Sequence, residues 1–285
     1  MAKVLVTGGS GFIGGHLCKL LHKMGHVVFS LDIKDSSPQP WKVITSDIRE
    51  DIVFPEIDAV VHLAAQISVA QSMEYPAETI SINVEGTSKV IEAAKIAGAT
   101  RFIFASSAAV YGDAEEMPIT ESAPMLPQSP YAESKISGEE MVRNSGMKTC
   151  SMRFFNIYGP GQSISGGYAA VIPAFKKAIT SNQSPKVFGD GSQVRDFVHV
   201  SDLVRIIELA IEAEDLPSEV NIASGQRTSL LDLLRALNKI NPIMCEPTFS
   251  QVRSGDIHTS VADISRMVQY FNPGKMIQLS TGLKW

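Results

Sequence analysis

A tyrosine and a lysine four residues apart, Tyr131 and Lys135, form the pattern in this sequence with the clearest chemical meaning. On a helix, positions i and i+4 share one face, and Pro130 suits the first turn of such a helix. A lysine ammonium beside a phenol favours the phenolate, which can act as a base. To act near pH 7, a tyrosine needs its pKa lowered by about 3 units, or about 4 kcal/mol. The same spacing also occurs on exposed helical faces that have no function, so the surrounding sequence must decide.

Two hydroxyl residues, Ser106 and Ser107, end the apolar run Phe102–Ala105 and precede Tyr131 by about two dozen positions. In alternating α/β proteins the ends of the strands carry the chemistry. Ser107 is therefore predicted to hydrogen-bond the oxygen that Tyr131 deprotonates. The alternative is that the two serines only end the strand and cap the next turn.

A glycine-rich turn follows the first apolar run. Gly8, Gly11 and Gly14 come directly after Lys3–Val6 and open an amphipathic segment, an order that suits a pyrophosphate held at a helix N-terminus. Asp32 ends a second apolar run, where a carboxylate accepts hydrogen bonds from a ribose 2′-hydroxyl and repels a 2′-phosphate. The pair predicts dinucleotide binding and favours NAD over NADP. A glycine turn in an ordinary α/β domain is the alternative.

Apolar runs alternate with helical patterns through the first half of the chain, which predicts an α/β fold: a Rossmann-type doubly wound parallel sheet with a smaller C-terminal substrate-binding lobe. Strands are expected at 4–6, 27–31, 43–45, 59–63, 102–105 and 149–155, with helices at 12–24 and 84–97. Later elements are expected at 170–180, 186–188, 197–200, 201–212, 220–223 and 230–238, with Ser201 as one N-cap, Thr228 and Ser229 as another, and an irregular remainder. We assign residues 1–157 and 196–224 to an NAD-binding domain, and 158–195 and 225–285 to the lobe.

The composition sets outer limits on function. The chain has 285 residues, a formal net charge of −5 and three cysteines without metal-ligand or disulfide spacing. We expect a reducing, cytoplasmic location, no membrane span, no signal peptide, no metal and no nucleic-acid partner. An anionic ligand must be held by local cationic groups, since the overall charge opposes it. Cys18, Cys150 and Cys245 are expected to fill the core, and His62 and His199 to be structural.

Taken together, these motifs resemble the extended short-chain dehydrogenase/reductase family, specifically its NAD-dependent nucleotide-sugar epimerases. The resemblance covers nearly the whole chain in family order. It is carried by residues 7–14, 62–65, 83–87, 106–112, 131–135, 153–161, 189–191, 195–202 and 253–256.

The resemblance implies a role for each matching position. Ser107, Tyr131 and Lys135 look like the catalytic residues. The positions that match cofactor contacts are Gly8, Gly11, Phe12, Ile13, Gly14, Asp32, Ile33, Lys34, Asp47, Ile48, Leu63, Ala64, Ala65, Asn83, Tyr131, Lys135 and Phe155. Those that match substrate contacts are Ser107, Asn156, Val187, Phe188, Arg195, Arg253, Asp256 and Ser260. Arginine suits a diphosphate because its guanidinium is permanently charged and bidentate.

The residues after Ser107 discriminate among reactions of such a family. Relatives that dehydrate or decarboxylate sugars resemble one another in carrying carboxylates here, whereas this chain has Ala108 and Ala109, which can neither donate nor accept a proton. The expected activity is a UDP-sugar 4-epimerase acting through a transient 4-keto sugar. A UDP-glucuronate epimerase, a nucleotide-sugar reductase and a non-catalytic dinucleotide sensor stay open as alternatives.

The resemblance also carries expectations about the sugar and about assembly. Ser260 stands where the family sets the volume of the sugar pocket, and residues 166–173 resemble epimerases of N-acetylated sugars, so UDP-GlcNAc and UDP-GalNAc are expected beside UDP-Glc and UDP-Gal. A homodimer is expected through a four-helix interface of 84–97 and 131–144. Val90, Ile91, Ala94, Ile136 and Met141 are compatible with that interface and equally with packing against the sheet.

Overall fold

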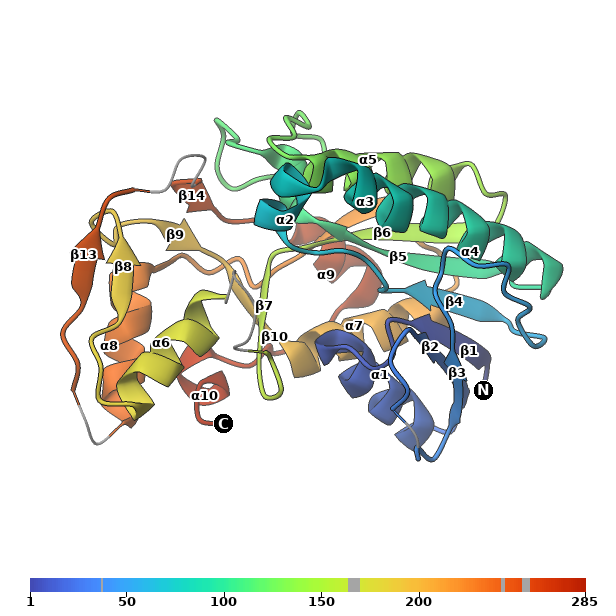
Figure 1. Cartoon of the computed structure of the whole chain (residues 1–285), viewed down its shortest axis with the longest axis horizontal. Helices are drawn as coiled ribbons and strands as arrows, with labels where there is room; N and C mark the ends of the chain where they lie inside the picture. Colours follow the sequence, from blue (N-terminus) through green and yellow to red (C-terminus); the bar gives the residue numbers. More distant parts are fainter. Residues whose placement is uncertain (37, 164–169, 242–243, 253–256) are drawn as a thin grey trace.

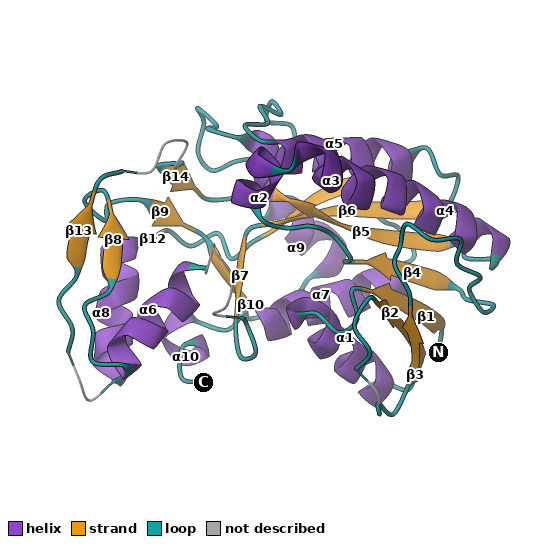
Figure 2. Cartoon of the chain, in the orientation of Figure 1, coloured by secondary structure: helices purple, strands orange, loops and turns teal. Residues whose placement is uncertain are grey.

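A parallel sheet forms the centre of the computed structural model, which describes residues 1–36, 38–163, 170–241, 244–252 and 257–285 (Figures 1 and 2). In these residues, seven strands pair in the order β11-β6-β5-β4-β1-β2-β3. They are β1 (Lys3–Thr7), β2 (Val27–Asp32), β3 (Lys42–Thr45), β4 (Ala59–His62), β5 (Arg101–Ser107), β6 (Lys148–Phe154) and β11 (Glu219–Ile222). The strand order reverses between β1 and β4, which is where such sheets bind ligands. The predicted fold class is confirmed.

Helices cover both faces of the sheet because its strands are apolar on both sides. Val4 and Val6 pack into one core with Leu17 and Leu21, whereas Leu5, between them, packs into the other. The first face holds α1 (Phe12–Lys23), α7 (Val200–Glu212) and α9 (Ser265–Phe271). The second holds α4 (Gly86–Ile96) and α5 (Pro130–Arg143), joined by α2 (Val69–Glu74), α3 (Pro76–Ile80) and the π-helical turn η1 (Ser81–Glu85).

A smaller lobe lies at one end of the molecule, and its core is separate (Figure 1). Ile172 and Phe175 pack there against Leu233 and Leu237. The lobe is built from α6 (Val171–Thr180), β8 (Lys186–Phe188), β9 (Val194–Arg195), β12 (Thr228–Ser229), α8 (Leu230–Ile240), β13 (Thr248–Ser250), β14 (Thr259–Ser260) and α10 (Leu279–Gly282). The parallel pair β7 (Asn156–Tyr158) and β10 (Phe197–His199) joins it to the large sheet.

Two local predictions need correction. Ser201 is not the N-cap of α7: the helix begins at Val200, and the His199 side chain caps it, its Nδ1 accepting a hydrogen bond from the Ser201 amide at 3.2 Å. The C-terminal stretch is not irregular, since it forms β13, β14, α9 and α10. These elements are too short to show a clear periodicity in the sequence, and tertiary packing stabilises them. The predicted Ser229 cap of α8 is confirmed.

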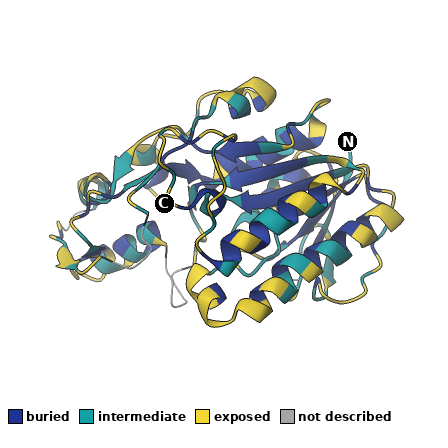
Figure 3. Ribbon diagram, turned by 90° about the horizontal axis from the view of Figure 1, so that it is seen from above, coloured by how far each residue is buried: buried dark blue, intermediate teal, exposed yellow. Residues whose placement is uncertain are grey.

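The strands of the central sheet are mostly buried (Figure 3). The three cysteines are all free and buried, as predicted. Burial raises the pKa of Cys18 to about 12, so this thiol is inert. Among the described residues, no helix has the length and apolar character that crossing a membrane requires. The same residues contain no group of three metal-ligating side chains.

Close packing of α5 on β5 can be tested at Gly138. An added Cβ there would lie 2.4 Å from Cζ of the buried Phe104. We expect Gly138→Ala to lower the free energy of unfolding by about 1–3 kcal/mol, the usual cost of overpacking. Urea unfolding measures the change, and Ser137→Ala, one residue away, should stay within about 0.5 kcal/mol. Equal stability of the two variants would contradict this account of the packing.

Candidate active site

Tyr131 and Lys135 lie on one buried face of α5, as their spacing predicts. Ser129 caps the helix, its Oγ accepting a hydrogen bond from the Ala132 amide at 3.2 Å, and Pro130 occupies the first turn. Tyr131 is 9 % exposed and Lys135 is 4 % exposed. The cap and the proline therefore fix where α5 begins, and with it the position of the phenol.

The Lys135 ammonium is held by β5 rather than by a carboxylate. Its Nζ donates to the Ala105 carbonyl at 2.8 Å and lies 5.0 Å from the centroid of the Phe104 ring and 5.8 Å from that of Tyr131. Burial lowers the pKa of Lys135 to about 8, and the negative charge of Glu139 opposes that shift. The ammonium is therefore protonated below about pH 8 and can lose its proton just above.

Ser107 lies close enough to Tyr131 to lower the pKa of its phenol as a hydrogen-bonding neighbour, so the predicted pair is brought together. The Ser107 Oγ also accepts from the Ala109 amide at 3.2 Å and caps the 3-10 turn η2 (Ala108–Tyr111). The serine thus has both of the roles that the sequence allowed.

The protein by itself does not lower the pKa of Tyr131. Burial raises the pKa of Tyr131, and the hydrogen bond with Ser107 offsets this only in part. Removing the phenolate from water is costly because the site is dry. A further positive charge against the phenol, brought by a ligand, is needed to lower its pKa.

The glycine turn is packed so tightly that side chains cannot be added. Gly8 has φ +70°, and a Cβ on Gly14 would lie 2.1 Å from the Gly8 carbonyl oxygen. No side chain in the described part of the chain caps α1, which begins at Phe12 after an extended Gly11. The first N–H groups of α1 therefore keep their capacity to bind an anion. Together with Ile13, these residues form a cradle that fits a pyrophosphate.

Asp32 closes the other side of this cradle at the end of β2. Its carboxylate accepts hydrogen bonds from the Ser10 and Lys34 amides, each at 3.0 Å. These bonds fix the carboxylate beside the glycine turn, where a ribose would follow the pyrophosphate. Ile33 is exposed beside it. The donor set fits NAD, with Asp32 as the ribose acceptor.

The two residues predicted to contact adenine have different environments. Asp47 is half-buried and pairs with Arg49, whose guanidinium nitrogen lies 2.6 Å from its Oδ2 and lowers its pKa. The Ile48 side chain is buried in the core, and a Cβ on Gly86 would lie 2.7 Å from its Cδ1. Only the backbone of Ile48 is therefore left for contact with a ligand.

Asn83 is a buried clamp between the end of β4 and α5. Its Oδ1 accepts from the Gln66 amide at 2.8 Å, and its Nδ2 donates to the Gln66 carbonyl and to the Ser134 Oγ, each at 2.9 Å. Thr7 fixes the same loop from β1, since its Oγ1 accepts from the amides of Leu63 and Ala64, each at 3.2 Å. Residues 63–66, Ala65 included, are thus held by side chains from two other elements.

His62 is structural, as predicted. Its Nε2 lies 2.9 Å from the Thr87 Oγ1, which donates to the Asn83 carbonyl at 2.6 Å. Thr87 must then accept from Nε2, so Nδ1 accepts from Thr7 at 2.7 Å. Burial lowers the pKa of His62 to about 3, and the imidazole stays neutral.

The predicted substrate residues gather where the lobe meets the large sheet. Asn156, Phe188 and Arg195 line a cavity of about 380 Å³, while Val187 points into the core of the lobe. Phe155 is buried beside Tyr111, and Ser260 pairs in register with Arg195. Arg253 and Asp256 lie outside the described residues. Ser107 is in register with Phe154, two residues before Asn156, so the cavity adjoins the strand end that carries the serine.

Several cavity residues were not predicted. Lys186, Gln162 and the first turn of α6 line the cavity, and the Lys186 Nζ lies 4.9 Å from the centroid of the Phe188 ring. Residues two apart on a strand share a face, so the strand prediction at 186–188 contained the signal for Lys186. Gln162 lies in a loop, where no periodicity operates.

Comparison with known proteins agrees with this geometry. Residues 4–223 match the model of the NAD dependent epimerase/dehydratase family. The chain belongs to this family. It is 34% identical over 301 residues to a UDP-glucose 4-epimerase of Mycolicibacterium smegmatis, covering 99% of this chain and 96% of the relative.

Solved structures give the same result. A UDP-N-acetylglucosamine 4-epimerase of Methanobrevibacter ruminantium, in complex with UDP-N-acetylmuramic acid, matches with a TM-score of 0.91 and 32% identity, covering 100% of this chain and 97% of that one. A UDP-glucose 4-epimerase of Thermotoga maritima with UDP-glucose matches with a TM-score of 0.90 and 32% identity, covering 99% and 96%.

The cofactor cradle can be tested with two adjacent glycines. We expect Gly14→Ala to weaken NAD binding by about 100-fold or more, about 2.7 kcal/mol, because its Cβ meets backbone rather than a movable side chain. Gly15→Ala is the control, since its Cβ would lie 3.9 Å from the nearest oxygen. Titration calorimetry with NAD measures both, after circular dichroism shows that they fold. Equal affinity of the two variants would remove the pyrophosphate from this turn.

Proposed function

We propose that this protein is an NAD-dependent UDP-sugar 4-epimerase that works through a transient 4-keto sugar. The observation that carries the proposal is the burial of Tyr131 and Lys135 together on one face of α5, beside Ser107 at the carboxyl end of β5. The family and the names of its relatives support the same reaction.

The residues divide the work of one reversible oxidation. When bound, NAD would supply the hydride acceptor for C4 and a positive charge that favours the phenolate of Tyr131. Tyr131 removes the proton of the C4 hydroxyl, Ser107 hydrogen-bonds the same oxygen, and Lys135 stabilises the phenolate. The keto sugar then turns over in the pocket and is reduced at C4 on its other face. Tyr131 returns the proton to the C4 oxygen in this reduction.

Elimination of water is disfavoured because the carboxylates near β5, in the part of the chain that the structure describes, are held by other groups. Ala108 and Ala109 follow Ser107, and the buried Glu121 is held by the Asn221 amide at 2.9 Å and by Arg266 at 3.6 Å. Glu139 is likewise held by Arg153. In the described residues around β5, the groups left for proton transfer are Tyr131 and Ser107, which suit epimerisation.

The alternatives are less well supported by the same residues. A reductase using NADPH conflicts with the Asp32 carboxylate beside the glycine turn. A non-catalytic dinucleotide sensor has no need of a buried Tyr131, Lys135 and Ser107 in contact. A UDP-glucuronate epimerase uses the same chemistry and differs only in the sugar, so substrate assays separate it.

Removing the phenol tests the reaction. NMR should show that the wild type forms a C4 epimer from UDP-galactose, from UDP-N-acetylgalactosamine or from both. UDP-glucuronic acid is assayed in parallel. Tyr131→Phe should lower kcat by about 100- to 10,000-fold, the usual contribution of a positioned acid–base group. NAD affinity, measured in parallel, should be retained. Turnover equal to the wild type would exclude Tyr131 as the base.

Ser260 is proposed to leave room for a 2-acetamido group. The residue lies on β14 in register with Arg195 of β9, and both are half-buried. The small side chain supports acceptance of UDP-GlcNAc and UDP-GalNAc beside UDP-Glc and UDP-Gal. Of the related segment 166–173, residues 166–169 lie outside the described residues, while Ala170, Val171 and Ile172 line the cavity.

A bulky residue at this position should separate the two substrate classes. Ser260→Tyr should reduce kcat/KM for UDP-N-acetylgalactosamine at least about tenfold more than for UDP-galactose, a difference of about 1.4 kcal/mol. Thr259→Tyr is the control, since adjacent residues of a strand face opposite ways. Equal losses on both substrates in Ser260→Tyr would argue against a role in sugar selection.

Assembly, location and domain boundaries stay predictions. Val90, Ile91 and Ala94 are buried in the core of the single chain, so these positions face the sheet and not a partner. Ile136 and Met141 also pack against core residues. A dimer through α4 and α5 must then use their outer faces, which present Glu92, Ile96, Glu133 and Glu140. Met267 and Phe271 of the predicted lobe segment pack in the core of the large sheet.

A further inference from the structure

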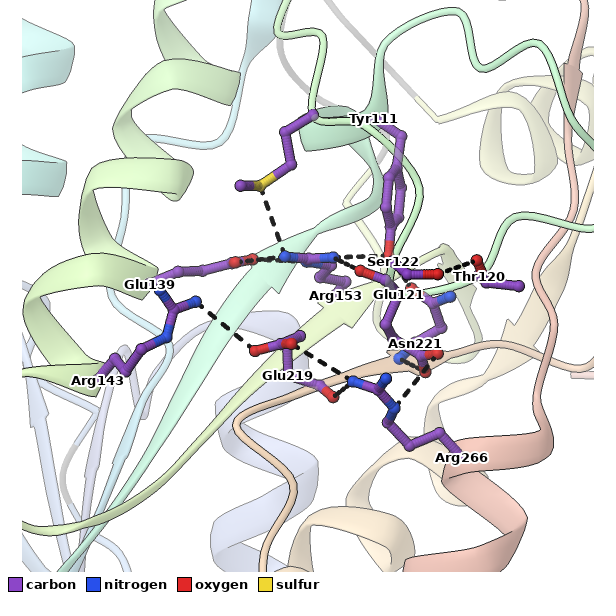
Figure 4. Close-up of polar contacts among 11 residues, drawn as sticks. Tyr111, Thr120, Glu121, Ser122, Glu139, Arg143, Arg153, Glu219, Asn221 and Arg266 are labelled. Atoms are coloured by element: carbon purple, nitrogen blue, oxygen red, sulfur yellow. Dashed lines mark hydrogen bonds and ion pairs between the residues drawn. The ribbon is translucent and has the colours of Figure 1, made fainter.

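Glu139, one helical turn beyond Lys135 on α5, forms an ion pair with Arg153 of β6 (Figure 4). Glu139 and Arg153 are both about 2 % exposed. The Arg153 Nε donates to the Glu139 Oε1 at 2.9 Å, and its terminal nitrogen donates to Oε2 at 2.7 Å. The Ser106 Oγ donates to Oε1 at 2.5 Å. Both oxygens of the Glu139 carboxylate therefore accept hydrogen bonds, Oε1 from residues of β5 and β6 and Oε2 from β6.

Arg153 is anchored in turn by a wider network. Its other terminal nitrogen donates to the Tyr111 hydroxyl at 2.9 Å and to the Glu121 carbonyl at 3.0 Å. Tyr111 donates to the Asn221 Oδ1 at 2.6 Å, which reaches β11. The guanidinium therefore cannot follow a movement of α5, and it holds the Glu139 end of that helix against the sheet.

Three successive residues of β5 are tied to α5. Ala105 accepts from Lys135, Ser106 donates to Glu139, and Ser107 bonds Tyr131. The middle contact fixes the Glu139 end of α5 to β5. Since a misplacement of about 1 Å can cost about 100-fold in rate, this contact bears directly on the Ser107–Tyr131 geometry.

The charges around the Lys135 ammonium come from four elements. α5 contributes Tyr131 and Glu139, and β4 contributes His62, which is neutral. β5 contributes the Ala105 carbonyl and the face of Phe104, and β6 contributes the cationic Arg153 behind Glu139. Because Arg153 takes the Glu139 oxygens, the carboxylate acts on Lys135 through space and does not pair with it.

We propose that Glu139 and Arg153 are positioning residues. They fix α5 on β5 through Ser106, which places Tyr131 beside Ser107, and they balance the charge around Lys135. The proposal rests on the proposed roles of Tyr131 and Lys135. It assigns a task to a buried pair that touches neither substrate nor cofactor.

The two charges should act on Lys135 in opposite directions. Glu139→Gln removes the negative charge, so the lysine should lose its proton at a pH about one unit lower, and the alkaline limb of kcat should move down with it. Arg153→Gln removes the positive charge behind Glu139, so both should move up, by less than about one unit because this charge lies farther from Lys135. A role in packing alone would lower activity in both variants without opposite shifts.

Two measurements follow these shifts. ¹⁵N NMR of lysine-labelled protein, with Lys135→Met to assign the signal, reports the titration of the ammonium directly in the absence of substrate. The pH dependence of kcat reports the limb. Glu140→Gln is the matched control, an exposed neighbour on the same helix, and should titrate like the wild type. Arg153→Lys keeps the charge and should return the titration to the wild-type pH.

Each outcome decides the proposal. Identical titration of Lys135 in wild type, Glu139→Gln and Arg153→Gln would overturn the proposal. If only one variant folds, a shift of the Lys135 titration in the direction expected for that variant supports the proposal, and an unchanged titration overturns it. If neither variant folds, Ser106→Ala decides, because it keeps both charges. Its kcat should fall at least tenfold, while KM and the alkaline limb of the kcat profile stay unchanged. A kcat equal to that of the wild type would overturn the proposal. If Tyr131→Phe keeps full activity, the proposed function fails instead, and the Lys135 titrations still report on the ion pair.

Discussion

The packing of α5 against the carboxyl end of β5 is the constraint on which the candidate site depends. It buries an ammonium and a phenol together, and burial moves both pKa values in the direction that disfavours charge. The dry environment that makes ionisation costly also makes each remaining electrostatic contact stronger. A ligand charge entering this site would therefore have a larger effect on the phenol than it would in water.

Buried polar side chains fix the loop next to this contact through their hydrogen bonds. Asn83, Thr7 and His62 hold the loop after β4, and each is buried with its hydrogen bonds made. Asn83 lies in the π-helical turn η1 between α3 and α4, an irregularity that functional sites often retain. The floor of the site is thereby fixed from three elements that are distant in sequence.

Sequence predicted those parts of the molecule in which local pattern and function coincide. The strands are short apolar runs, and the glycine turn, Asp32 and Ser107 stand where such strands end, so their convergence followed from topology. Tyr131 and Lys135 were predicted from their spacing on one face of a helix. The Glu139–Arg153 pair could not be predicted, because its partners come from different elements and neither has a periodic signature. Spacing likewise shows the lysine beside Tyr131 but does not show how far burial raises the pKa of the phenol. The Ser201 error arose because a histidine ring took the capping role that composition assigns to serine.

The uncapped start of α1 couples ligand loading to folding. Its first amides must otherwise turn to solvent, which leaves this turn less protected than the rest of the helix. A dinucleotide seated on those amides would bind the native chain and not the unfolded one, and would raise its resistance to heat by mass action. Protein made in cells short of the dinucleotide would then be expected to accumulate less well, through turnover rather than through any defect in the reacting groups.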